Sequence, residues 1–123
     1  MRKLALEAVR EIRKRIMWKP GRDAEHLAKR IRLEHLPPGA TMTEYEAIIL
    51  AVVNDPKAEV YAFVPAGTAD LHPTFVAEVG GERWLVASDQ DGTIRTAFPP
   101  DDPDGHLADP QFIYLGTLEE MES

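Results

Sequence analysis

Apolar residues in the first 36 positions recur at helical spacing. One stripe at i, i+4, i+7 and i+11 predicts a helix over residues 2–17 and consists of Ala5, Val9, Ile12 and Ile16. Pro20-Gly21 ends this helix. Asp23 is placed to cap a second helix over residues 23–36, which Pro37 and Pro38 cannot continue.

A third helix follows, and the pattern then changes to strands. Thr43 and Glu46 have the spacing of a capping box, which predicts a helix that ends near Asn54. Runs rich in Val, Tyr and Phe then predict strands over residues 58–65, 73–79, 82–88 and 93–98, with a hairpin turn at Gly80-Gly81.

The last segments complete an α+β chain. Residues 99–110 contain four prolines and predict an exposed acidic loop, and residues 111–115 predict a short strand at a sheet edge. We therefore expect one domain over residues 1–123, with three N-terminal helices (1–54) packed on a four- to five-stranded antiparallel meander sheet (58–115).

Charge is distributed unevenly along this order. The first 36 residues hold eleven of the fourteen Lys and Arg and five acids, a net charge of +6, whereas the whole chain carries −7. A basic end can bind a polyanion by releasing its counterions. It can equally pair with the acidic body of the chain or with an acidic partner protein.

Composition excludes several kinds of site. The chain has no cysteine, which removes disulfides and thiol nucleophiles and fits a reducing compartment, so we expect a cytoplasmic protein. No apolar run approaches the roughly 20 residues of a membrane span, so we expect no membrane partner. The four histidines lack compact metal-ligand spacing, and neither a metal nor a cofactor is expected.

The second predicted helix carries the first candidate site. His26, Lys29 and Arg30 stand at i, i+3 and i+4 and share one face, where an imidazole beside two cations can serve a phosphodiester. His35 would lie roughly 13 Å further along the helix and on nearly the opposite face, so one straight helix cannot bring both histidines to one phosphate. The alternative is a solvated helix with His35 as a favourable C-terminal charge.

The strand over residues 93–98 carries the second candidate. Alternation places Ile94, Thr96 and Phe98 on one face and Arg95 on the other. Arg95 can bind a phosphate with two nitrogens, or it can pair with an acid across the hairpin, either Glu82 or Asp89. The position of Thr96 between two apolar neighbours on the same face favours a buried strand residue over a functional one.

Residues 23–99 resemble the small metal-independent ribonucleases grouped around barnase, colicin D and RelE, and their polymorphic-toxin and phage-associated branches. The resemblance rests on His-x-x-Lys-Arg, Pro-Pro-Gly, a capped helix with Glu-Tyr-Glu, and a meander ending in Gly-Thr-Ile-Arg-Thr-Ala-Phe-Pro. It implies RNA cleavage by attack of the 2′-hydroxyl on the adjacent phosphate, and an inhibitory immunity or antitoxin protein as a partner.

The same resemblance implies roles for particular residues. The implied catalytic residues are His26 or its substitute His35, with Arg30, Arg95 and Thr96, and we assign substrate binding to Lys29 and Arg32. Two other functions stay open. The chain can be a non-catalytic interaction module that docks an acidic partner through its basic helices, or an RNA-binding domain that stacks bases on Trp18.

Overall fold

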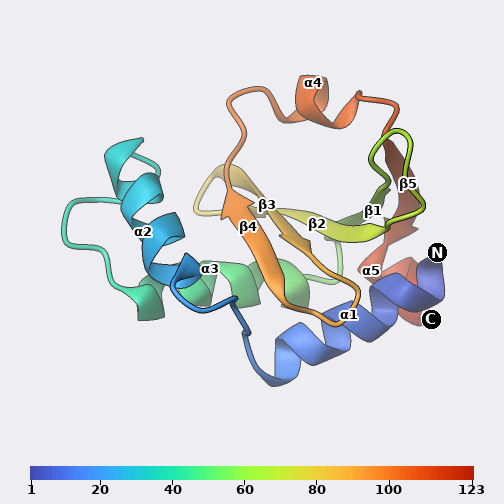
Figure 1. Ribbon diagram of the computed structural model, residues 1–123, viewed down its shortest axis with the longest axis horizontal. Coiled ribbons are helices and arrows are strands. Elements are labelled where there is room, and N and C mark those ends of the chain that lie inside the picture. The colour runs from blue at the N-terminus through green and yellow to red at the C-terminus, as the bar shows by residue number, and fades with distance from the viewer.

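A five-stranded antiparallel sheet is the centre of this computed structural model, which describes residues 1–123 (Figure 1). The strands are β1 (Glu59–Phe63), β2 (His72–Val79), β3 (Glu82–Ser88), β4 (Ile94–Phe98) and β5 (Phe112–Thr117). Their order is β4-β3-β2-β1-β5, so the predicted meander is confirmed and β5 forms the predicted edge. Gly80 and Gly81 both have positive φ, 59° and 84°, as a two-residue type I′ turn requires.

Helices cover the two faces of the sheet unequally, and the predicted α+β class is confirmed. α1 (Arg2–Lys14) and α3 (Met42–Asn54) pack beneath the sheet, whereas α2 (Arg22–Arg32) packs against α3 and the β4 edge. The short α4 (Pro103–Leu107) lies over the opposite face, and α5 (Leu118–Glu122) packs beside α1, which brings the two termini together (Figure 1). The face beneath α4 is therefore the more open one.

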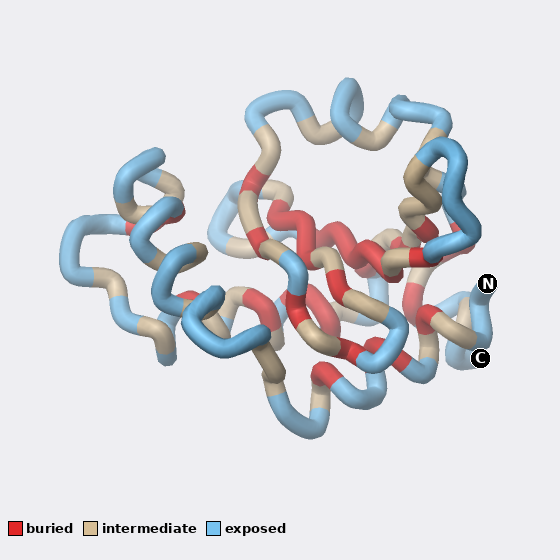
Figure 2. The backbone as a smooth tube through the Cα atoms, viewed as in Figure 1, coloured by how far each residue is buried: buried red, intermediate tan, exposed pale blue.

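The hydrophobic core lies between the sheet and the helices α1 and α3, where buried segments face each other (Figure 2). α3 contributes Tyr45, Ile49, Val52 and Val53, all fully buried. The Tyr45 hydroxyl donates a 2.6 Å hydrogen bond to the Ala97 carbonyl, which ties α3 to β4. None of the helices has the length and apolar composition needed to cross a bilayer.

The boundaries of α2 differ from the prediction at both ends. The helix follows Gly21, whose φ is 80°, and Asp23 does not cap it. It ends at Arg32, where Glu34 takes a left-handed φ of 62° and the amides of residues 35 and 36 both bond to the Arg30 carbonyl. This turn lets Leu36 reach the core, and it leaves His35 beyond the helix.

Three further local predictions need correction. The capping box of α3 is Thr41 with Glu44, not Thr43 with Glu46, because Glu46 accepts a hydrogen bond from the Trp18 indole at 3.0 Å. The predicted loop 99–110 contains α4, which Asp102 caps at the amide of residue 105. A second capping box, Thr117 with Glu120, starts α5, which the sequence pattern had not indicated.

Candidate functional site

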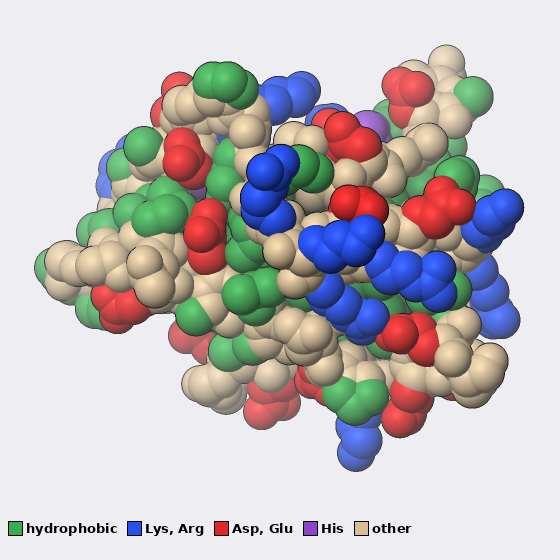
Figure 3. All heavy atoms as spheres, turned by 90° about the horizontal axis from the view of Figure 1, so that it is seen from below, with side chains coloured by type: hydrophobic (Ala, Val, Ile, Leu, Met, Phe, Trp, Pro, Cys, Tyr) green, Lys and Arg blue, Asp and Glu red, His purple; other side chains and the backbone are tan.

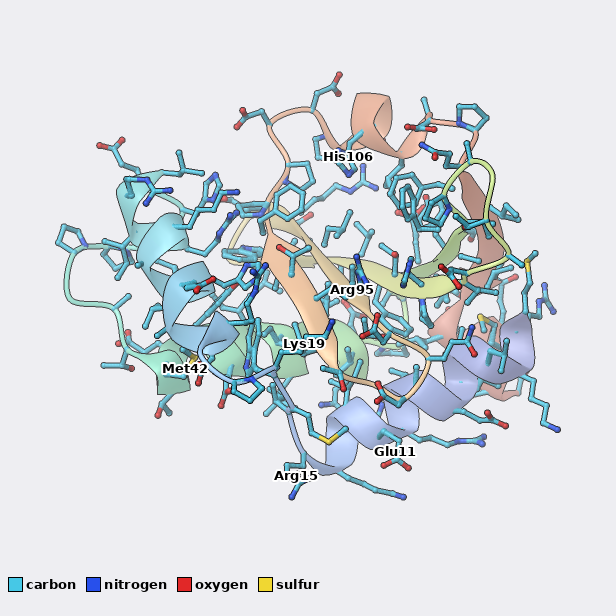
Figure 4. The ribbon with its side chains drawn as sticks, in the orientation of Figure 1. Glu11, Arg15, Lys19, Met42, Arg95 and His106 are labelled. Atoms are coloured by element: carbon cyan, nitrogen blue, oxygen red, sulfur yellow. The ribbon has the colours of Figure 1, made fainter.

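The face of the sheet opposite α1 and α3 carries a cavity of about 530 Å³. All five strands supply residues to its lining, and the segment around α4 lies across it. Arg95 stands on the sheet and His106 beneath α4, on the two sides of this space (Figure 4). We call this space the cavity.

Aromatic rings form a continuous arc along the cavity. The Phe63 ring lies 6.3 Å from His72 and 4.7 Å from Phe112, measured between ring centres. His106 continues the arc, at 5.5 Å from Phe112 and 5.7 Å from Phe98, the latter edge to face. Such walls favour a flat ring as ligand, because every ring can stack or meet an edge.

A β-bulge turns two adjacent residues of β4 into the cavity. Ser88 pairs with Ile94 and Ala87 with Thr96, so Arg95 is the extra residue without a partner on β3. Arg95 and Thr96 consequently line the same cavity, which overturns the simple alternation that placed them on opposite faces. Ile94 lies in the core, so the prediction that it shares a face with Thr96 is also wrong.

Asp89 stands behind two of the polar side chains of the cavity. Its Oδ1 accepts a hydrogen bond from Arg95 Nη1 at 3.0 Å, one of the two acid pairings that the sequence offered as the alternative to phosphate binding. The same oxygen lies 3.4 Å from Nδ1 of His72. This nitrogen is buried, and the two atoms do not form a hydrogen bond. This second contact is therefore electrostatic.

Arg83 anchors the α4 segment above the cavity. Its guanidinium donates to Asp104 of α4 at 2.7 Å and to Glu59 of β1 at 2.9 Å. The hydrogen bond to Asp104 is the main cause of the raised Arg83 pKa. Gln111, which follows the segment, accepts a hydrogen bond from the Ala66 amide through its side chain. The α4 segment, which forms the roof of the cavity, is thus tied to the sheet by these ion pairs and by the packing of His106 on Phe98 and Phe112.

A groove of about 350 Å³ adjoins the cavity between α2 and β4, and the two share Thr96 and Phe98. Lys29, Arg30 and His35 line this groove. Burial and the nearby Arg30 charge lower the pKa of His35, which holds its imidazole neutral. Four of the residues that the sequence singled out therefore meet in the groove: Lys29, Arg30, His35 and Thr96.

Two predicted residues lie elsewhere. His26 stacks on Trp18, with ring centres 5.5 Å apart, and both of its ring nitrogens are buried without a partner. It lines neither the cavity nor the groove, because its helix face packs inward. Arg32 is exposed and lines neither space. Trp18 is half-buried, with its ring 5.5 Å from His26 and 5.8 Å from Tyr45.

The basic residues of α1 form a mixed surface. Arg13 donates to both carboxylate oxygens of Glu122 and to the Val53 carbonyl, while Lys14 pairs with Glu11. On this side of the molecule several Lys and Arg side chains lie next to one another, with Asp and Glu side chains beside them (Figure 3). Part of the positive N-terminal charge therefore holds the fold together.

Sequence reasoning missed His72 and His106 as cavity residues. His72 opens a strand that looks purely structural, and His106 lies in a segment read as a loop. The one signal for them was composition, since two of only four histidines fall in the acidic part of the chain. No protein-family model, curated protein or solved structure matches this chain.

Proposed function

We propose that this protein is a metal-independent endoribonuclease and that the cavity is its active site. The observation that carries the proposal is one aromatic-lined space on the open sheet face, containing two imidazoles, a guanidinium and a hydroxyl: those of His72, His106, Arg95 and Thr96. These are the groups that RNA transesterification needs, a base, an acid and donors for the developing negative charge.

In the proposed reaction the 2′-oxygen of a ribose attacks the adjacent phosphorus. His72 takes the 2′ proton, since Asp89 near its Nδ1 leaves Nε2 free to act as the base. The bond from phosphorus to the 5′-oxygen breaks, and His106 gives that oxygen its proton. Arg95 and Thr96 donate to the phosphorane oxygens, and the products are a 2′,3′-cyclic phosphate and a free 5′-hydroxyl.

The proposal keeps part of the site expected from sequence. Arg95 and Thr96 retain their catalytic roles, whereas proton transfer moves from His26 and His35 to His72 and His106. The reason is access, because His26 has both nitrogens buried and His35 lines the groove rather than the cavity.

Cleavage of tRNA and total RNA in EDTA tests the proposal. We expect wild-type protein to leave cyclic phosphate ends, and His106→Gln or Arg95→Gln to lose roughly a hundredfold in rate. Arg32→Gln is the matched control, since it removes the same charge from an exposed residue that lines neither space. Wild-type protein without activity, or the same rate in all three variants, would overturn the proposal.

We further propose a cytoplasmic location and an inhibitory partner protein. The absence of cysteine supports a cytoplasmic location, where RNA is abundant. An inhibitory protein of the immunity or antitoxin kind would have to cover the cavity. Adding such a protein should then lower the cleavage rate in proportion to the fraction of cavities that it covers.

A second candidate is a non-catalytic module that docks an acidic partner. Arg10, Arg15 and Lys19 are exposed and make no ion pair, which leaves their charge available for such a contact. This function predicts an association that weakens as salt is raised and that Arg10→Gln reduces. It also predicts that Arg95→Gln leaves the association unchanged, which separates it from the ribonuclease.

A further inference from the structure

Arg30 is a buried cation without an acidic partner. Its side chain is 3% exposed, and it takes part in none of the ion pairs of the protein. Nε is buried without a hydrogen bond, Nη1 bonds to His35 at 3.1 Å, and the guanidinium stacks over Phe98 at 5.3 Å. A buried charge of this kind is costly unless an anion compensates it.

The hydrogen bond from Arg30 sets the tautomer of His35. A guanidinium can only donate, so Nδ1 of His35 must accept and the ring proton lies on Nε2. His35 therefore offers the groove a donor instead of a base. This differs from the catalytic role that the sequence resemblance implied for it.

The polar groups of the groove are mostly donors. Nη2 of Arg30 makes no hydrogen bond and is not fully buried, and Lys29 lines the same space. Asp101 is the one carboxylate in the lining, and it is exposed. Converging donors around an uncompensated guanidinium are the chemistry of a phosphate site.

We infer that the groove binds a backbone phosphate of a nucleic-acid strand, next to the nucleotide held in the cavity. The inference rests on the proposed RNA substrate, and its geometric basis is that Thr96 and Phe98 line both spaces. A strand seated with one base among the aromatic rings can pass over β4 and place a neighbouring phosphate against Arg30 and Lys29.

Binding of a trinucleotide that cannot be cleaved tests this inference. The probe carries 2′-O-methyl groups, and titration calorimetry at several salt concentrations gives its Kd. Lys29→Gln is compared with Arg32→Gln, an equal charge change one turn further along the same helix and outside the groove. We expect Lys29→Gln to weaken binding about five- to tenfold and to reduce the salt slope by about 0.7, and Arg32→Gln to change Kd less than twofold.

Equal losses in the two variants would show unspecific charge attraction and overturn the inference. Inorganic phosphate serves as a second probe by NMR. A contrary outcome is that phosphate shifts the Lys29 and His35 resonances and yet is not displaced by the trinucleotide. This result would identify a site for free phosphate and overturn the assignment to a nucleic-acid strand. Arg30→Lys, checked for folding by thermal melting, should also weaken the trinucleotide, because lysine keeps the charge but loses the planar stack.

The two proposals fail separately. If wild-type protein cleaves no RNA but the Lys29→Gln loss persists, the groove stands and the ribonuclease proposal falls. If cleavage occurs and Lys29→Gln binds like Arg32→Gln, the ribonuclease stands and the groove assignment falls.

Discussion

Asp89 holds Arg95 at 3.0 Å across the bulged end of the β3–β4 hairpin. The bulge places Arg95 in the lining of the cavity, and its hydrogen bond to Asp89 restrains the guanidinium. Oδ1 also lies 3.4 Å from Nδ1 of His72, so one acid contacts side chains from two different strands.

Asp89→Asn should therefore reduce RNA cleavage by roughly ten- to a hundredfold, since the amide is a weaker acceptor and Arg95 loses its fixed position. Single-turnover kinetics on a short RNA measure the change. Asp70→Asn is the control, because Asp70 is exposed and lies outside the cavity lining. A variant that cleaves at the wild-type rate would show that Asp89 does not position the site.

Arg83→Gln should loosen the roof of the cavity. The change removes both ion pairs, to Asp104 and to Glu59, and leaves the α4 segment without its charged anchor to the sheet. We expect faster amide hydrogen exchange in residues 103–107 and a higher KM for RNA, with a global stability loss of about 1 kcal/mol or less, since the pairs are partly exposed. Unchanged exchange in α4 would contradict the anchoring role.

Tyr45→Phe should destabilise the fold by about 1–3 kcal/mol, because the buried Ala97 carbonyl loses its hydroxyl donor. Urea unfolding measures this loss, and Tyr114→Phe is the control on an exposed tyrosine. Burial also raises the pKa of Tyr45 to about 12. The unfolded chain ionises this group first, so wild-type stability should fall as the pH rises from about 10 to 12. That fall should shrink in Tyr45→Phe.

His26→Phe should reduce the amount of folding free energy that the protein loses in mild acid. Burial, with the charges of Arg22, Arg30 and Lys29, lowers the pKa of His26, so the folded protein resists a proton that the unfolded chain accepts. Stability is complete above the ordinary histidine pKa of about 6.5 and is lost as the pH falls below it. The free energy of unfolding of the variant should still fall with falling pH, but less steeply, because the pKa of His35 is lowered too.

Urea unfolding at pH 7 and at pH 5 measures this difference for the wild type and for His26→Phe. RNA cleavage at pH 7 should survive the substitution, since His26 does not line the cavity. Identical pH slopes in the two proteins would contradict the stated origin of the acid sensitivity. Loss of cleavage in a folded variant would show that His26 has a role in the active site.

Local sequence patterns were enough to place the three N-terminal helices and the five strands, but not α4 and α5. Helical spacing, strand-forming runs and turn residues such as Gly80-Gly81 act within a few residues of one another, so the element order, the meander and the edge position of β5 could be predicted. The end of α2 could not, because it depends on Leu36 reaching a core built by other elements. The start of α3 shows the same limit. Thr41 with Glu44 and Thr43 with Glu46 have identical spacing in the sequence, and only the folded chain shows that Glu46 bonds to Trp18 instead.

The sequence by itself determined an α+β chain and a helix that carries Lys29 and Arg30 on its basic face. Only the tertiary structure decided which side chains meet. Arg30 stacks on Phe98, which is 68 positions away, and the bulge brings Arg95 to the same cavity as His72 and His106. These meetings depend on strand register and on a roof folded across the sheet. Neither is encoded in the spacing of neighbouring residues, and that is why the proposed acid and base escaped prediction.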